Sequence, residues 1–167
     1  NVLQILDLSQ IPLHAEDRGE DDPVVIGGGP CVYNPEPIAD FFDMFYIGEA
    51  ETVYYELMDV YKENKARGLG REDFLKAAAK VPGIYIPEFY EAKYDPDGTL
   101  SAFGPKKEYE GIAPEKVVKQ VYPDMSEAFY PEKPLVPFVQ VTQDRACIEI
   151  QRGCIRGCRF CQAGMIY

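Results

Sequence analysis

Three cysteines with a fixed spacing lie near the C-terminal end of this 167-residue chain. Cys154, Cys158 and Cys161 occupy positions i, i+4 and i+7 of one short stretch that also contains Gly153 and Gly157. Thiolates are the ligands that iron–sulfur clusters use in proteins, and glycine lets a loop close tightly without a Cβ clash. The spacing therefore predicts that these residues form a loop around a cluster, and not part of a regular helix or strand.

Three cysteines supply three irons of a cubane [4Fe-4S] cluster with a protein ligand and leave the fourth iron open. An open metal position can bind a small molecule, as it does in a catalytic zinc site. Arg152, Arg156 and Arg159 flank the cysteines, and their charges favour the thiolate forms. The loop is therefore predicted to bind a ligand as well as to hold a cluster.

Two short apolar runs, each followed at once by glycine, mark the first part of the chain. Pro23-Val24-Val25-Ile26 leads into Gly27, Gly28 and Gly29. The second stretch, residues 43–47, consists of Asp43 and four apolar residues and leads into Gly48. Buried parallel strands have this pattern. The three glycines at the end of the first run can cradle a phosphate or a nucleotide tail. They match neither GxGxxG nor a P-loop, and the alternative is a tight turn that allows close packing.

Helical spacing of apolar residues predicts helices over residues 2–8 and 49–67, on either side of these strands. Residues 1–70 then alternate helix and strand, which is typical of an α/β fold. We expect them to form part of a doubly wound, Rossmann-like domain.

Residues 71–137 have a different pattern and are predicted to form a mixed α+β linker. A helix is expected over residues 71–80, and an antiparallel hairpin around Asp95-Pro96-Asp97-Gly98, where Pro and Gly favour a turn. Four prolines between residues 123 and 137 predict an extended connector.

The string Cys154-x-x-x-Cys158-x-Phe160-Cys161 has an aromatic residue just before its last cysteine. In this it resembles the radical S-adenosylmethionine (SAM) superfamily. The resemblance implies that the three cysteines hold a [4Fe-4S] cluster, that SAM binds its open iron, and that Phe160 packs beside the adenine. It also implies one-electron cleavage of SAM to a 5′-deoxyadenosyl radical, with a reductant such as ferredoxin or flavodoxin as partner.

The cysteine string and the two glycine strings together are similar to an uncharacterised bacterial group with a cobalamin-binding-like domain ahead of the barrel. The resemblance implies that residues 1–70 are the C-terminal half of that domain. Residues 138–167 would start the barrel, with residues 145–151 as its first strand. A barrel needs roughly 200 residues, so we expect a piece of a longer enzyme, inactive alone. His14, the only histidine, lies outside any cobalt-ligating motif, which argues against cobalamin binding.

The net charge of −11 disfavours a free-standing nucleic-acid binder. No run approaches the roughly 20 apolar residues that span a bilayer, and no signal peptide is visible. We therefore predict a cytoplasmic protein with no membrane partner. The related enzymes carry out methyl transfer, methylthiolation and rearrangements, and the sequence leaves the substrate open between RNA and a small molecule.

Three alternatives stay open at this point. A zinc-stabilised interaction domain would use Cys147 as the fourth ligand, with His14 a weaker candidate. A non-catalytic module would bind a corrinoid or a nucleotide through its glycines. In the third alternative the thiols of the isolated chain carry no metal, because an incomplete barrel cannot shield a cluster.

Overall fold

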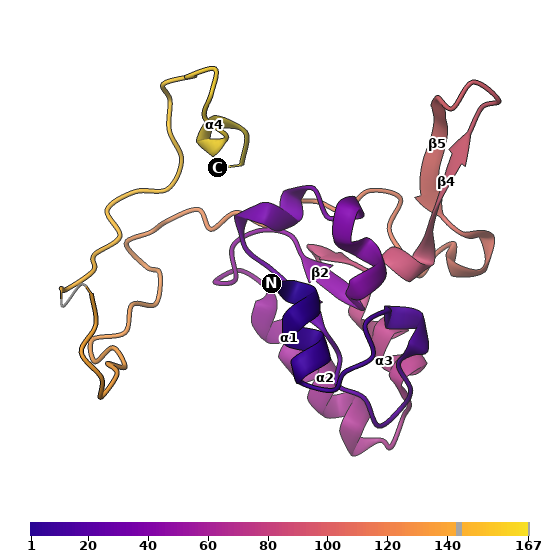
Figure 1. Cartoon of the computed structure of the whole chain (residues 1–167), viewed down its shortest axis with the longest axis horizontal. Helices are drawn as coiled ribbons and strands as arrows, with labels where there is room; N and C mark the ends of the chain where they lie inside the picture. The colour runs from indigo at the N-terminus through magenta and orange to yellow at the C-terminus, as the bar shows by residue number, and fades with distance from the viewer. Residues whose placement is uncertain (143–144, 167) are drawn as a thin grey trace. The chain divides into compact units, whose positions relative to one another are not determined.

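The computed structural model of the protein describes residues 1–142 and 145–166 (Figure 1). The chain divides into two compact units, Asn1–Val121 and Tyr122–Tyr167, called unit 1 and unit 2 below. Unit 1 combines helices with two short sheets. The mixed α/β character predicted from the sequence is therefore confirmed.

A three-stranded sheet lies at the centre of unit 1, with the strand order β1-β2-β3. Strand β1 (Ile26–Gly27) pairs in parallel with β2 (Met44–Tyr46), and β3 (Ile84–Tyr85) pairs antiparallel with β2. Every residue of β2 is buried. The two apolar runs thus form neighbouring parallel strands as predicted, although both strands are shorter than the runs.

Three α-helices belong to unit 1: α1 (Val2–Leu8), α2 (Tyr54–Ala66) and α3 (Arg71–Ala78). Helix α1 ends where the sequence predicted, and α2 ends before Gly68, which has a φ of 64°. Shorter 3-10 helices cover Ala15–Asp17 (η1), Pro30–Tyr33 (η2), Glu36–Phe41 (η3), Pro87–Phe89 (η4) and Lys107–Tyr109 (η5).

Helix α2 begins five residues later than the predicted start at Glu49, and the backbone carbonyl of Glu49 explains the difference. That carbonyl accepts hydrogen bonds from the Tyr46 hydroxyl at 2.9 Å and the Thr52 hydroxyl at 2.8 Å. Local side-chain bonds of this kind compete with the helical pattern. The residues after β2 therefore form a turn instead of a first helical turn.

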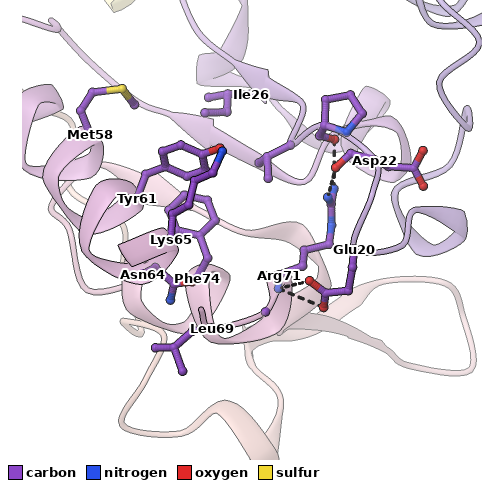
Figure 2. Close-up of a pocket in the computed structure, with 13 residues that line it drawn as sticks. Glu20, Asp22, Ile26, Met58, Tyr61, Asn64, Lys65, Leu69, Arg71 and Phe74 are labelled. Carbon is purple, nitrogen blue, oxygen red and sulfur yellow. Dashed lines mark hydrogen bonds between the residues drawn. The ribbon is translucent and has the colours of Figure 1, made fainter. Parts of the chain in front are cut away.

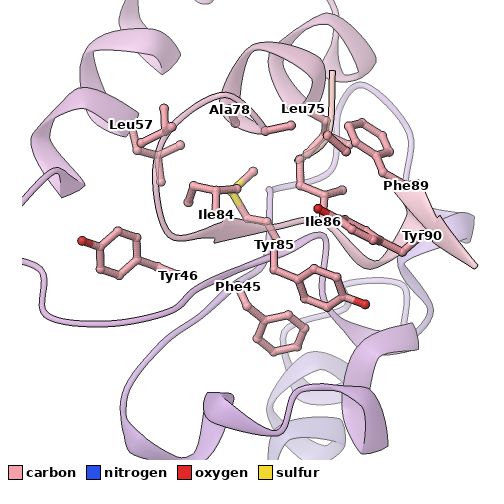
Figure 3. Packing of buried hydrophobic residues seen from close by; sticks show 14 of the residues in the cluster. Phe45, Tyr46, Leu57, Leu75, Ala78, Ile84, Tyr85, Ile86, Phe89 and Tyr90 are labelled. Atoms are coloured by element: carbon pink, nitrogen blue, oxygen red, sulfur yellow. The ribbon is translucent and has the colours of Figure 1, made fainter. Parts of the chain in front are cut away.

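One hydrophobic core holds the central sheet together with α2 and α3 (Figure 3). Leu57 of α2, Ala78 of α3 and Phe45 of β2 are each fully buried. Ile84 and Phe89 complete the same cluster. Residues on both sides of position 70 share this core, so the two units do not coincide with the segments 1–70, 71–137 and 138–167. That three-part division stays a prediction about the domains of a longer protein.

Strands β4 (Tyr90–Tyr94) and β5 (Leu100–Pro105) form the antiparallel hairpin that the sequence predicted (Figure 1). At its turn, the Asp95 amide donates to the Thr99 carbonyl at 2.8 Å, and Gly98 has a φ of 84°. The Tyr90 ring is buried at the base and stacks on Phe103, with ring centres 5.7 Å apart. Beyond this base the hairpin is exposed on both faces.

A buried ionic network ties three distant parts of unit 1 together. The Asp43 carboxylate accepts bonds from Arg18 Nη1 at 3.0 Å and Arg71 Nη2 at 2.6 Å. It also accepts a bond from the Val25 amide at 2.6 Å. The side chains of Asp43 and Arg18 are almost completely buried. Asp43 therefore fixes the start of β2 against the chain that leads into β1.

Two buried tyrosines in ring contact, Tyr85 of β3 and Tyr90 at the base of the hairpin, are protected from ionisation. Burial raises the pKa of Tyr90 to about 12, and its hydroxyl donates to the Pro114 carbonyl at 2.7 Å. Burial and the hydrogen bond to the Glu36 carboxylate together raise the pKa of Tyr85 far above its ordinary value. In both cases the folded chain favours the neutral phenol.

Alkaline pH is therefore expected to destabilise unit 1. An unfolded tyrosine ionises near pH 10, so the stabilisation from the neutral phenols is complete below pH 10. It is lost as the pH rises through about 12, the pKa of folded Tyr90. Urea unfolding at a series of pH values measures this loss. The loss should be smaller in Tyr90→Phe, and a profile equally steep in that variant would contradict the assignment.

Unit 2 has little regular structure in its described residues. Its α-helix, α4 (Ala163–Ile166), begins two residues after the last cysteine. Residues 145–151, expected to be the first strand of a barrel, run without strand pairing. A strand is stable only when it pairs with a neighbour, and no described segment pairs with this one. The barrel strand is therefore not confirmed.

Candidate functional site

The cysteine loop of unit 2 contains a tight turn between its second and third cysteines. The Cys161 amide donates to the Cys158 carbonyl at 3.0 Å, which places Arg159 and Phe160 at the corner of the turn. Gly153 and Gly157 have φ values of 81° and 57°, a region that L side chains rarely adopt. Both glycines therefore bend the loop, as the sequence predicted.

Helix α4 begins two residues after the last cysteine. The Gln162 carbonyl accepts bonds from Met165 and Ile166 at 2.9 and 3.0 Å. A Cβ placed on Gly164 of α4 would lie 3.8 Å from the Cys154 carbonyl oxygen. The first cysteine and the helix after the third are therefore in contact range, so the loop folds back on itself.

The side chains of the cysteine loop point into solvent. Cys154, Cys158 and Cys161 are all exposed and form no disulfide, and the Phe160 ring is 92% exposed. Among the residues that the structure describes, no three Cys, His, Asp or Glu side chains are grouped as a metal site. The three thiols are accessible but are not grouped around one point, so their role as cluster ligands stays a prediction.

The donor set is nevertheless of the kind that iron–sulfur clusters use. It consists of three thiols on a bent loop, and thiolates are the usual ligands of such clusters. Arg156 and Arg159 are exposed within the loop. The sequence also predicted that the charge of Arg152 would favour the thiolate forms. In the structure, Nε and Nη2 of Arg152 each lie 2.9 Å from a carboxylate oxygen of Glu149. Its charge is directed to that carboxylate.

The three glycines at the end of β1, Gly27 to Gly29, have different roles. A Cβ on Gly27 would lie 2.5 and 2.7 Å from two ring carbons of Phe45, so this glycine lets β1 approach the core. Gly29 has a φ of 89° and precedes η2. A Cβ on Gly28 would meet no atom within 4 Å. Packing and turn geometry account for Gly27 and Gly29, and their predicted role in holding a cofactor stays a prediction.

A half-open cavity of about 490 Å³ lies between α2, α3 and the chain that leads into β1 (Figure 2). Met58, Tyr61 and Phe74 supply apolar walls, which is typical of small-molecule sites of this size. Polar groups on its rim are bonded within the protein. The Glu20 carboxylate accepts the Arg71 amide at 2.8 Å, and the Arg71 side chain bonds Asp43. The cavity therefore has the size and apolar walls of a small-molecule site, while Glu20 and Arg71 on its rim are hydrogen-bonded within the protein.

Comparison with known families decides what kind of protein carries this loop. Residues 1–87, more than half of the chain, match the family described as "Radical SAM proteins, N-terminal". The chain belongs to this radical SAM family. The matched residues end before the cysteines, so the assignment is independent of the loop on which the sequence prediction depended.

A relative of this radical SAM chain extends the similarity further. "Uncharacterized protein MJ0966" of Methanocaldococcus jannaschii is 28% identical over 157 residues, which cover 90% of this chain and 26% of that protein. The chain therefore spans about a quarter of the length of the curated relative. No solved structure matches the chain. Among the described residues, no helix is both long and apolar enough to cross a membrane.

The sequence did not predict two long-range contacts around β2 in this radical SAM chain. Gly48, two residues after the end of β2, touches the backbone of Gln120. A glycine after a buried strand indicates a close approach, but nothing local identifies a partner so far along the chain. Asp43 was likewise predicted at the start of a strand, but its ion pairs with Arg18 and Arg71 were not predicted.

Proposed function

We propose that this chain is part of a radical SAM enzyme in which Cys154, Cys158 and Cys161 hold a [4Fe-4S] cluster. One observation carries the proposal: a bent three-cysteine loop occurs in a chain whose first 87 residues match a radical SAM family. Neither half is sufficient alone, because cysteine loops also bind zinc and a family match does not identify ligands. The proposal concerns the whole protein, because this chain spans only about a quarter of the length of the curated relative.

The residues of the loop have separate roles in this proposal. The three thiolates bind three irons, and the turn between Cys158 and Cys161 sets the spacing of the last two. Phe160 at the corner of that turn is exposed and supplies a flat apolar surface for an adenine ring. Arg156 and Arg159 lower the cost of gathering negative charge in the loop. When bound, the cluster and SAM supply the electron transfer that yields a 5′-deoxyadenosyl radical.

In this proposal unit 1 is an α/β module that precedes the cysteine loop along the chain. The parallel pairing of β1 and β2, with glycines close to the end of each strand, is consistent with a doubly wound ancestor. The barrel, the substrate and the reductant, such as a ferredoxin or flavodoxin, belong to the whole enzyme.

Cluster assembly under anaerobic conditions tests the proposal. The chain is incubated with iron and sulfide, desalted, and analysed for iron, sulfide and the absorption of a cubane cluster. We expect about four irons per chain, and we expect Cys158→Ala to lose most of them because a thiolate ligand is missing. Cys31→Ala is the matched control, since Cys31 is also exposed but lies in unit 1.

Two outcomes would overturn the proposal. The first is iron uptake that is equal in Cys158→Ala and Cys31→Ala, because this would show binding that does not use the loop. The second is one tightly bound zinc that is lost in Cys147→Ala, because this would show the four-thiolate interaction domain instead. The same analysis on the whole protein, with 5′-deoxyadenosine measured after reduction, tests the catalytic part.

A further inference from the structure

The carboxyl ends of β1 and β2 meet at one edge of the sheet, because the two strands are parallel. Open α/β domains bind their ligands at this edge, in the crevice outside the strand ends. In unit 1 another part of the same chain lies there. Residues 117–121, called the strap, reach this edge after the hairpin and η5.

Backbone hydrogen bonds fix the strap directly beyond the end of β2. The Gln120 amide donates to the Ile47 carbonyl at 3.0 Å, and the Glu49 amide donates to the Gln120 carbonyl at 2.9 Å. These two bonds form a parallel bridge between Gln120 and Gly48. The Glu49 amide, which follows the strand end, is therefore already occupied by the chain itself.

The strap also reaches the element that follows β1. Lys119 Nζ lies 5.5 Å from the ring centre of Tyr33, the last residue of η2. This distance is within the range of a cation–π contact. Helix η2 comes directly after the three glycines. Neighbouring residues of the strap thus contact the segments beyond both parallel strands.

Two glycines provide the space that the strap occupies. Gly48 has a φ of 130°, and a Cβ there would overlap the Gln120 carbonyl oxygen and lie 2.5 Å from its nitrogen. Gly83 has a φ of 83°, and a Cβ there would lie 2.8 Å from Gln120 Cγ. Backbone atoms cannot shift as easily as the end of a flexible side chain. A side chain at position 48 would therefore displace the strap.

We propose that the strap fills the ligand-binding edge of unit 1, and that Gly48 and Gly83 serve to seat it. A dinucleotide or a corrinoid tail needs open space and unbonded amides beyond the strand ends. Beyond β2 the strap takes the space next to Gly48 and bonds the Glu49 amide, and beyond β1 it contacts Tyr33 of η2. The radical SAM chain therefore retains the α/β frame as a scaffold that fixes the segment running toward the cysteines. This inference concerns unit 1 alone and does not depend on cluster binding.

Hydrogen exchange of individual amides tests whether the strap is seated as described. The Glu49 and Gln120 amides should be protected in the unchanged chain, and roughly tenfold less protected in Gly48→Ala. Gly28→Ala is the matched control, because a Cβ there meets nothing within 4 Å. Its exchange should equal that of the unchanged chain.

A second variant covers the case in which Gly48→Ala fails to fold. Gln120→Pro removes the amide that bonds Ile47 and leaves the residues of the core unchanged. It should lose protection at Glu49 while the amides of β2 stay protected. Unaltered Glu49 protection in both Gly48→Ala and Gln120→Pro would overturn the proposal.

Ligand binding gives an independent readout. Equilibrium dialysis of the unchanged chain against hydroxocobalamin, and separately against NAD, should show no binding at the strand ends. Saturable binding of either probe while the Glu49 and Gln120 amides remain protected would also overturn the proposal, because it would show that the seated strap leaves the edge open.

Discussion

Replacing Asp43 by alanine is expected to lower the free energy of unfolding by about 3–5 kcal/mol, because it leaves buried arginines without their carboxylate. Arg18 is fully buried and Arg71 is 10% exposed, and both donate to Asp43. The remaining Arg18 bonds, to the carbonyls of Pro12, Leu13 and Phe41, do not neutralise its charge. The Val25 amide loses its partner as well.

Urea unfolding followed by circular dichroism measures this loss. Asp59→Ala is the matched control, because Asp59 forms an ion pair with Lys62 at the same 3.0 Å distance on an exposed helix surface. Exposed pairs contribute little to stability, so the control should unfold close to the unchanged chain. An Asp43→Ala chain as stable as Asp59→Ala would contradict the role assigned to the network.

Phe89→Ala is expected to cost about 3–5 kcal/mol, since it removes a fully buried ring and leaves a cavity. The ring stacks on Tyr109 with centres 3.9 Å apart, and aromatic pairs of this kind add to the effect of burial. Phe89 ends η4 directly before β4. Its loss should therefore loosen the hairpin base as well as the core.

The same substitution at an exposed site separates burial from the general effect of removing a phenylalanine. Phe129 is 80% exposed, and Phe129→Ala should leave the unfolding free energy nearly unchanged. Thermal or urea unfolding compares the two variants directly. Equal losses in both would show that the core does not depend on Phe89 as the structure indicates.

Local patterns in the sequence predicted the elements whose causes are local. The apolar run at residues 44–47 contains the fully buried β2, because a strand covered on both faces needs no polar alternation. The Asp95–Gly98 string forms the hairpin turn, because Gly98 accepts the positive φ that the turn requires. Gly153 and Gly157 bend the cysteine loop for the same reason.

The missed features depend on residues that are far apart in the sequence. Nothing near Asp43 shows that Arg18 and Arg71 will reach it, and nothing near Gly48 identifies Gln120 as its neighbour. The expected strand at residues 145–151 has strand composition but no described pairing partner. Composition can predict a preference for extended structure, whereas pairing is a property of the whole fold.

The hairpin has a consequence for how proteins of this kind can change length. Its base is held by Tyr90 and Phe103, and the residues beyond that base contact solvent on both faces. Adding two residues to each strand would extend the arm by about 7 Å, at about 3.4 Å per residue. The central sheet and the arginine-bound carboxylate would be untouched by such an insertion. Evolution can therefore vary the reach of this arm without redesigning the body that carries it.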